Sequence, residues 1–147
     1  VGGHCIAVDP WFIVSQDPEN SRIIKIAREI NNSKPDWVVD KIKATADSMS
    51  TKKVVCLGLA FKPDIDDLRE SPAVRVVESL MEQGYDVSCV EPNINEHQKY
   101  NLIDINKAIA QFDVIALLVN HKEFTSNMIL SELESKGTLD FCGTFSK

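Results

Sequence analysis

The apolar residues of this chain follow two different periods, and the change falls near residue 50. From about residue 21 to residue 49 the spacing is helical, because Ile23, Ile26 and Ile30 fall on one helical face. Pro35 lacks a backbone N–H and crowds the turn before it, so we expect a kink or a break there. So long a helix cannot bury its apolar face alone. We therefore expect a helical core or dimer interface completed by other residues or by another chain.

Beyond residue 50, short apolar runs alternate with helical segments. The first run, residues 54–61, is apolar throughout, which is typical of a strand buried on both faces. Ser71 and Pro72 then provide an N-cap and a first-turn proline for a helix that Gly84 ends. Further strands are predicted at 85–90, 113–119 and 138–142, and further helices at 105–111 and 126–135. The alternation predicts an α/β fold, a Rossmann-like parallel sheet with flanking helices, preceded by a long helical segment.

Composition is that of an ordinary globular protein, with 44% hydrophobic and 26% charged residues in a chain of 147. The formal net charge of −6 argues against a nucleic-acid-binding surface, which is normally basic. No apolar run approaches the roughly 20 residues needed to cross a membrane. Because the chain is acidic as a whole, a phosphorylated ligand would need locally placed cations.

The chain begins in a glycine-rich segment, Val1-Gly2-Gly3-His4-Cys5, without an initiator Met or a signal peptide. We therefore expect it to be part of a longer protein.

The four cysteines form no CxxC pair, so neither a zinc knuckle nor a thioredoxin-type site is predicted. His97 and His121 have no metal-ligand spacing with other candidate ligands either, and we expect no metal. Cys56 and Cys89 lie in apolar runs, where a buried and reduced thiol is the usual state. This pattern favours a reducing compartment, and we expect a cytoplasmic protein.

The segment after the first strand carries the charges that a phosphate would need. Lys62 follows the strand, Arg69 lies further along, and a helix begins at Ser71 with N–H groups that we expect to be unpaired. Together these groups could hold a pyrophosphate. The alternative is a solvated loop in which Asp66 or Asp67 pairs with Arg69.

The first strand–helix turn lacks a GxGxxG motif, so an ordinary dinucleotide site is not predicted. Glu91 ends the second strand and could contact a ribose hydroxyl, although an acid in a loop before proline is equally usual.

Cys5 is the candidate nucleophile, because it follows two glycines that allow close approach to a ligand and precedes Asp9. A thiol becomes reactive when a cation, a histidine or a helix terminus lowers its pKa. The alternative is an inert small residue, which is the commoner state of a free cysteine.

Three blocks of sequence decide between these alternatives: Val1–Pro10, Ala27–Asn31 and Gly58–Ala73. In residues, order and spacing they resemble the UDP-glucose/GDP-mannose dehydrogenase family. The resemblance implies an N-terminal NAD-binding Rossmann domain outside this chain, a central helical domain and a C-terminal domain that holds the nucleotide sugar. Residues 1–50 would then end the central, dimerising domain, and residues 51–147 would form the UDP-sugar-binding domain.

The same resemblance implies roles for five residues. Cys5 matches the catalytic thiol, and Asp9 matches the acid associated with the hydrolytic water. Phe61 and Lys62 match positions that contact the nucleotide sugar, and Arg69 matches a position that contacts NAD. The implied reaction is the oxidation of a sugar C6 alcohol to a carboxylate with two NAD. Because the NAD-binding domain is missing, we expect this chain alone to be inactive, although it could still bind a uridine nucleotide weakly.

The choice of sugar depends on departures from the commoner family pattern. His4 stands where many members have serine, and Ala7–Pro10 replaces a Pro-Lys-Asp segment. This variant is similar to the family branch that acts on UDP-N-acetylhexosamines. With residues 11–14 and 63–67 added, the resemblance implies UDP-N-acetyl-D-mannosamine as the substrate and surface polysaccharide synthesis as its use. After Asp140, where members often carry a basic residue, this chain has Phe141-Cys142-Gly143, so either Lys147 supplies the charge or the contact is missing.

Two alternatives remain from the sequence. The first is a 6-dehydrogenase of the same family acting on UDP-glucose or UDP-N-acetylglucosamine. The second is a non-catalytic nucleotide-binding α/β domain in which Cys5 is idle.

Overall fold

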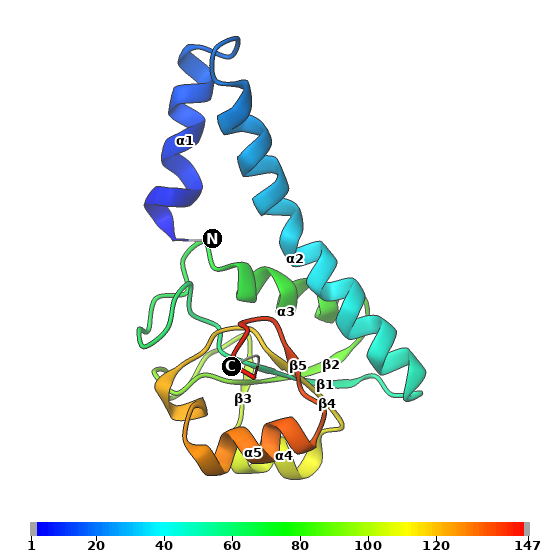
Figure 1. Ribbon diagram of the computed structural model, residues 1–147. Coiled ribbons are helices and arrows are strands. Elements are labelled where there is room, and N and C mark those ends of the chain that lie inside the picture. Colours follow the sequence, from blue (N-terminus) through cyan, green and yellow to red (C-terminus); the bar gives the residue numbers. More distant parts are fainter. Residues whose placement is uncertain (1–2, 146–147) are drawn as a thin grey trace.

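The computed structural model describes residues 3–145 of the chain, and of His4 the backbone alone. Two helices come first, and strands and helices then alternate to the end (Figure 1). In chain order the elements are α1 (His4–Gln16), α2 (Arg22–Ser48), β1 (Lys53–Leu57), α3 (Pro72–Glu82), β2 (Asp86–Val90), β3 (Asn101–Leu102), α4 (Ile105–Gln111), β4 (Val114–Leu117), the 3-10 turn η1 (Lys122–Phe124), α5 (Asn127–Ser135) and β5 (Leu139–Asp140).

The sheet confirms the predicted fold class. Its five strands lie in the order β3-β2-β1-β4-β5, and every neighbouring pair is parallel. The chain first builds the sheet from β1 outward to β3, and it then returns to the other side of β1 to add β4 and β5. In sheets of this kind the crevice beyond the carboxyl ends of the strands at the reversal point is where ligands bind. Here that point lies between β1 and β4.

Helices cover both faces of the sheet (Figure 1). On one face α2 and α3 pack through Val38, Ile42 and Val77 into a core that includes Cys56 and Cys89. On the other face α4 and α5 pack over a second core that includes the inward residues of β1 and β4. The central strands are therefore buried on both sides, as their continuous apolar runs predict.

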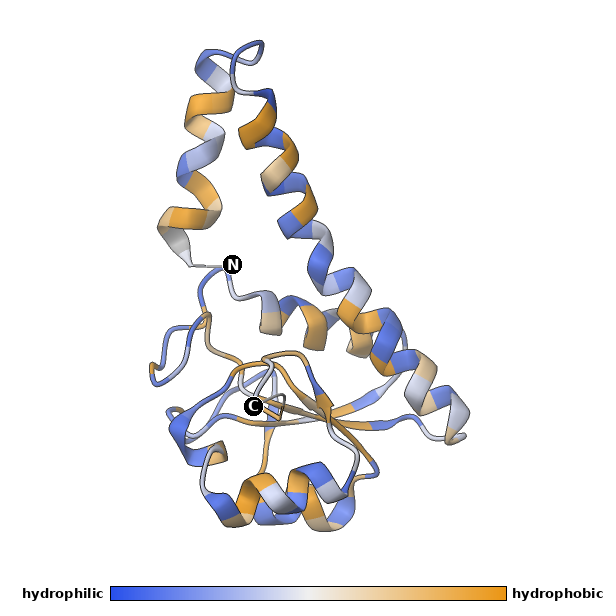
Figure 2. Ribbon diagram, viewed as in Figure 1, coloured by the Kyte–Doolittle hydropathy of each residue, from blue (hydrophilic) through white to orange (hydrophobic). Residues whose placement is uncertain are grey.

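The first half of α2 and the whole of α1 form a hairpin that extends away from the sheet (Figure 1). Large apolar side chains remain exposed on it, with Ile23 at 84%, Ile30 at 66% and Phe12 at 66% exposure (Figure 2). An apolar surface of this kind normally packs against another protein surface. The predicted completion of this surface by missing residues or a second chain stays a prediction.

Three details differ from the sequence-based expectations. Pro35 does not break α2, which runs without interruption from Arg22 to Ser48. The proline removes only one backbone donor from the helix, and its ring is buried by packing. The first strand ends at Leu57 instead of continuing to residue 61, because Gly58 adopts a φ of 87° that turns the chain. The helix α1 was not predicted from the glycine-rich opening segment, and neither was the short strand β3.

Among residues 3–145, no helix combines the length and the apolar character that crossing a bilayer requires.

Candidate active site

The candidate site is built around the loop that leaves β1 at the reversal point of the sheet, residues 58–71, here called the β1 loop. The loop folds back on itself, since Phe61 N donates to Asp67 O at 3.1 Å and Ser71 N donates to Leu68 O at 3.3 Å. Asp64 adopts a positive φ of 61°, a conformation that non-glycine residues rarely take. Such a conformation persists where neighbouring contacts hold it.

The start of α1 lies directly against the β1 loop. Gly3 N donates to Glu70 O at 3.3 Å, and a methyl group in place of a Gly3 hydrogen would lie 2.9 Å from Phe61 Cε2. A side chain at this position would displace the Phe61 ring. This contact brings Cys5 beside the β1 loop, although more than fifty positions of sequence separate Cys5 from Phe61.

Cys5 and Asp9 lie one turn apart on α1 and on the same face of the helix, because residues at i and i+4 are neighbours there. Both are exposed. Cys5 is in the first turn, where backbone N–H groups have no partner within the helix and the helix dipole favours negative charge. By contrast, Cys56 and Cys89 are fully buried free thiols, and burial raises the pKa of Cys89 to about 12.

Arg69 forms a two-pronged ion pair with Asp67. Arg69 Nε lies 2.9 Å from Asp67 Oδ1, and Nη2 lies 2.6 Å from Oδ2. The hydrogen bonds that Arg69 donates to Asp67 raise the pKa of Arg69 above its ordinary value, the charge of Asp67 adds to this, and the Cys5 sulfur contributes a smaller share. The pairing predicted for a solvated loop is therefore confirmed for Asp67. Arg69 is also close enough to Cys5 to interact electrostatically with it.

The N-terminus of α3 does not offer open N–H groups to a phosphate, and the expectation that it would is wrong. Ser71 Oγ accepts from Ala73 N at 3.2 Å and from Val74 N at 3.5 Å, and it donates to Leu59 O at 2.6 Å. Pro72, at the first helical position, has no N–H to give. Positive charge for a phosphate must therefore come from side chains. Lys62 is exposed, and no carboxylate among residues 3–145 forms an ion pair with it.

Glu91 points into the protein instead of toward a ribose. Its residue exposure is 5%, and Oε2 accepts from Leu59 N at 2.7 Å and Ala60 N at 3.1 Å. These are the backbone groups of the first strand–loop turn, where a dinucleotide fold would place its pyrophosphate. The carboxylate of Glu91 therefore occupies the position of that anion, which agrees with the absence of GxGxxG.

Burial alone would raise the pKa of Glu91, but the bonds from His121 and from Leu59 N outweigh it and lower the pKa from 4.5 to about 2. The stabilisation from the ionised carboxylate is thus complete above pH 4.5 and is lost as the pH falls toward 2. We expect Glu91→Gln to lower the free energy of unfolding by roughly 1–3 kcal/mol at pH 7 and by much less at pH 3. Urea unfolding of both proteins at the two pH values checks this. Equal differences at pH 7 and pH 3 would contradict it.

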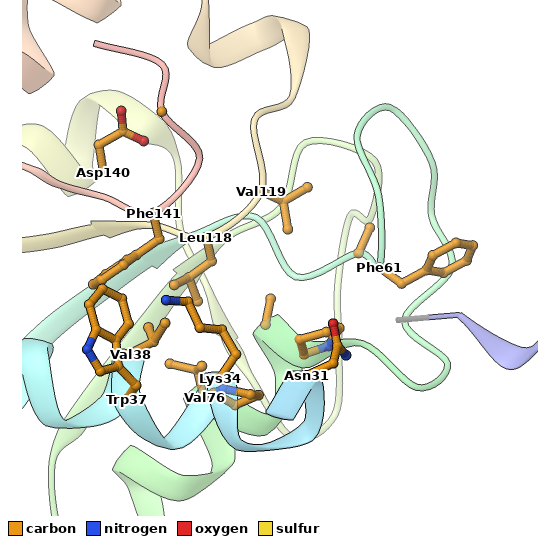
Figure 3. A pocket seen from close by; sticks show the side chains of 15 residues that line it. Asn31, Lys34, Trp37, Val38, Phe61, Val76, Leu118, Val119, Asp140 and Phe141 are labelled. Carbon is orange, nitrogen blue, oxygen red and sulfur yellow. The ribbon is translucent and has the colours of Figure 1, made fainter. Parts of the chain in front are cut away.

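A cavity of about 410 Å³ opens next to the β1 loop, between α2 and the carboxyl ends of β1, β4 and β5 (Figure 3). Trp37 forms its aromatic wall, with Lys34 Nζ 3.5 Å above the ring centroid and the Phe141 ring 5.9 Å away, edge-on. Phe61 borders the cavity, but its ring turns away toward the start of α1 (Figure 3). The lining residues are Asn31, Lys34, Pro35, Trp37, Val38, Ala60, Phe61, Pro72, Ala73, Val76, Leu118, Val119, Asp140, Phe141 and Gly143.

Lys34 and Trp37 are candidate site residues that the sequence interpretation did not identify. The sequence signal that could have identified them is a tryptophan on a predicted helix, with Lys34 three positions before it and Lys41 four positions after it. The structure also places Phe141 against Trp37. The segment after Asp140, where family members often carry a basic residue, therefore lies across the cavity wall from Lys34 of α2. Lys147, the alternative source of that charge, lies outside the described residues.

In the described part of the chain, Asp64, His121 and Glu123 form one group whose ligand atoms lie within 4.8 Å of one another. The Nδ1 atom of His121 already accepts a hydrogen bond from Asp64 N at 2.9 Å. With its lone pair engaged in this way, His121 gives no support to a metal site.

Comparison with known proteins agrees with the geometry. Residues 55–147 match the family model of the UDP-glucose/GDP-mannose dehydrogenase family, UDP binding domain. A UDP-N-acetyl-D-mannosamine dehydrogenase of Campylobacter jejuni is 48% identical over 97% of this chain, and an NDP-N-acetyl-D-galactosaminuronic acid dehydrogenase of Ralstonia nicotianae is 42% identical over 99% of it. The structure of a UDP-N-acetyl-mannosamine dehydrogenase from Staphylococcus aureus superimposes with a TM-score of 0.74 at 40% identity, covering 86% of this chain and 30% of that one.

The chain spans 35% of the Campylobacter protein and 36% of the Ralstonia protein, about a third of the length of these curated relatives. The family model nevertheless covers the α/β unit from Val55 in β1 onward, including the β1 loop and those cavity-lining residues that follow β1. This chain belongs to the UDP-glucose/GDP-mannose dehydrogenase family.

Proposed function

We propose that this chain is the substrate-binding and thiol-bearing part of an NAD-dependent dehydrogenase that oxidises UDP-N-acetyl-D-mannosamine to UDP-N-acetyl-D-mannosaminuronate for surface polysaccharide synthesis. The contact of Gly3 with Phe61 carries the proposal, because it joins the candidate nucleophile to the candidate nucleotide-sugar loop. Residues 1–50 would end a central domain, and residues 51–147 would form the UDP-sugar-binding domain.

Cys5 supplies the covalent chemistry in this proposal. Its sulfur adds to the C6 aldehyde of the sugar to give a thiohemiacetal, which keeps the aldehyde from escaping. Loss of a hydride from that carbon gives a thioester, and water then cleaves it to the carboxylate while the thiol is restored. Asp9, one turn along α1, accepts a proton from the water. NAD, when bound, accepts one hydride in each of the two oxidations.

The cofactor would be held mainly by the part of the protein outside this chain. The first strand–loop turn here does not fit a dinucleotide, because Glu91 engages its Leu59 and Ala60 N–H groups. Arg69 does fit a single contact, since its side chain is 69% exposed and lies within electrostatic range of Cys5. We therefore assign Arg69 as one contact to NAD and place no other part of the cofactor site on this chain.

The nucleotide would lie along the β1 loop at the reversal point of the sheet. Lys62 is a compact charge suited to a diphosphate, and it has no competing carboxylate among residues 3–145. The cavity walled by Trp37 adjoins the same loop and offers Lys34 as a second cation. Both features lie where ligands of parallel α/β sheets bind.

We expect Lys62→Ala in the full-length protein to weaken UDP binding by about tenfold, the effect of losing one charge-assisted contact of about 1.4 kcal/mol. Isothermal titration calorimetry with UDP measures it. Lys107→Ala is the matched control, because Lys107 is exposed on α4 at the opposite face of the sheet, and its affinity should stay within about twofold of the wild type. Equal affinities for the Lys62 variant and the wild type would remove Lys62 from the site.

The oligomer and compartment are part of the same proposal. The exposed isoleucines of α2 support a homodimer or an interface with the remaining domains. All four cysteines are free, which supports a reducing compartment such as the cytoplasm.

Turnover of a panel of nucleotide sugars by the full-length protein tests the proposal. UDP-N-acetyl-D-mannosamine should be oxidised with two NAD reduced per sugar. Faster turnover of UDP-glucose or UDP-N-acetylglucosamine would transfer the assignment to that sugar. Nucleotide binding without turnover of any of them would favour a non-catalytic domain. The Ralstonia relative, named for an N-acetyl-galactosaminuronic acid, makes the N-acetylgalactosamine nucleotide a necessary member of the panel.

A further inference from the structure

A buried histidine lies beneath the β1 loop. His121 follows β4 and has 0% exposure, yet the catalytic scheme above does not use it. Its Nδ1 atom lies 2.9 Å from Asp64 N, and its Nε2 atom lies 3.1 Å from Glu91 Oε2. Buried polar side chains with bonds at both ends fix the parts that they connect.

These two bonds define the tautomer. A backbone N–H can only donate, so His121 Nδ1 must carry a lone pair toward Asp64. The ionised Glu91 can only accept, so Nε2 must carry the hydrogen. His121 is therefore a neutral imidazole that accepts at one nitrogen and donates at the other. Asn93 Nδ2, 3.1 Å from Nδ1, donates to the same lone pair.

Asp64 forms hydrogen bonds to the segment after β4 through both its backbone and its side chain. While its N–H donates to His121, its Oδ1 accepts from Lys122 N at 2.9 Å. The middle of the β1 loop is thus attached to the segment after β4 by two bonds. These bonds hold Asp64 at its positive φ of 61°, and Lys62 lies two positions before it.

Glu91 secures the beginning of the same loop. Its Oε2 holds Leu59 N and Ala60 N, and its Oε1 holds Asn93 N at 3.2 Å. The charge of Glu91 is thereby spread over backbone donors and the imidazole of His121. The β1 loop, the end of β2 and the segment after β4 therefore form one hydrogen-bonded unit.

We propose that His121 is a positioning residue for substrate binding, which holds the Phe61–Asp64 segment in the conformation that contacts the nucleotide sugar. This rests on the function proposed above, in which Phe61 and Lys62 contact that ligand. His121 does not touch the reacting atoms in this scheme. It acts through Asp64 and Glu91.

Two substitutions separate the two bonds of His121. In His121→Asn the amide oxygen takes the place of Nδ1 and can accept from Asp64 N, while the bond to Glu91 is lost. In His121→Gln the amide nitrogen takes the place of Nε2 and can donate to Glu91, while Asp64 N loses its acceptor. His121→Gln removes the bonds that Nδ1 accepts from Asp64 N and Asn93 Nδ2, and His121→Asn removes the bond to Glu91. A purely structural role would lower stability in both variants without a selective effect on substrate binding.

We expect His121→Gln in the full-length protein to raise KM for UDP-N-acetyl-D-mannosamine about tenfold with kcat within about threefold, and His121→Asn to stay within about threefold in KM. Hydrogen exchange of peptides covering residues 61–70 should be at least about tenfold faster in His121→Gln than in His121→Asn. Wild-type KM and wild-type exchange in His121→Gln would overturn the proposal, and so would equal effects of the two variants.

Two arms keep the test decisive. If the wild-type protein neither binds nor oxidises the UDP-sugar, the proposed function fails, and the exchange rates still decide whether His121 holds the loop. If both His121 variants fail to fold, exposed Asp64 carries the test, because Asp64→Asn keeps the acceptor for Lys122 N and Asp64→Ala removes it. A higher KM and faster exchange in Asp64→Ala alone support the proposal, and equal values in both contradict it.

Discussion

Cys5→Ser in the full-length protein is expected to lower turnover of UDP-N-acetyl-D-mannosamine by at least about a thousandfold, in the range found when a covalent nucleophile is removed from other enzymes. A serine hydroxyl is a much weaker acid than a thiol, so it supplies far less of the anion that attacks the aldehyde. UDP affinity should stay within about twofold, because the thiol is assigned to the sugar C6 and not to the nucleotide.

Cys142→Ser is the matched control for this experiment. Cys142 is also a free, exposed cysteine, but burial of its sulfur raises the thiol pKa to about 11, and Sγ donates to Leu117 O at 3.6 Å, a bond that serine can keep. Its turnover should stay within about twofold of the wild type. Steady-state rates of NADH formation give both values. Turnover of Cys5→Ser within tenfold of the wild type would remove Cys5 from the chemistry.

The α/β part of the fold could be predicted because its signals are local. Ser71 and Pro72 begin α3 as predicted, and Gly84 follows its end. The strands were placed by apolar runs that stay buried on both faces. The predicted strand over 54–61 was too long because hydropathy does not distinguish a buried strand from a buried loop. Leu59 and Ala60 are fully buried, yet their N–H groups bind Glu91 instead of a neighbouring strand.

The helix α1 was hidden from sequence analysis for a physical reason. It contains Pro10 and begins after two glycines, and its apolar residues are largely exposed, so no amphipathic stripe marks it. Its position depends on the hairpin with α2 and on the contact of Gly3 with Phe61. Contacts of this kind arise only when distant segments meet.

The candidate site, like the fold, could be predicted from the sequence only in part. Cys5, Asp9, Phe61, Lys62 and Arg69 came from the resemblance to a family. The structure brings Gly3, two positions before Cys5, against Phe61 and places Arg69 within electrostatic range of Cys5. The direction of Glu91 could not be predicted, because an acid at the end of a parallel strand can face a ligand or the adjacent loop. The role of His121 was equally hidden. Its partners, Asp64 and Glu91, are 57 and 30 positions away in sequence.

Gly58→Ala is expected to lower the free energy of unfolding by about 2–5 kcal/mol, because two separate penalties meet at this position. Gly58 has a φ of 87°, which a residue with a side chain adopts at a cost of roughly 1–2 kcal/mol. The added methyl carbon would also lie 2.5 Å from Val119 Cβ and 2.7 Å from Val119 O. Backbone cannot rotate away as a side chain can, and overpacking of this kind costs about 1–3 kcal/mol.

Gly84→Ala separates the two penalties, because Gly84 has a nearly equal φ of 82° but nothing within 4 Å of an added methyl group. It should lower the free energy of unfolding by about 1–2 kcal/mol only. Urea denaturation of both variants measures the difference. UDP affinity should also fall in Gly58→Ala but not in Gly84→Ala, because relief of the clash moves Val119, which lines the cavity at the reversal point of the sheet. Equal destabilisation by the two substitutions would mean that β1 and β4 are not as tightly apposed at their carboxyl ends as the structure has them.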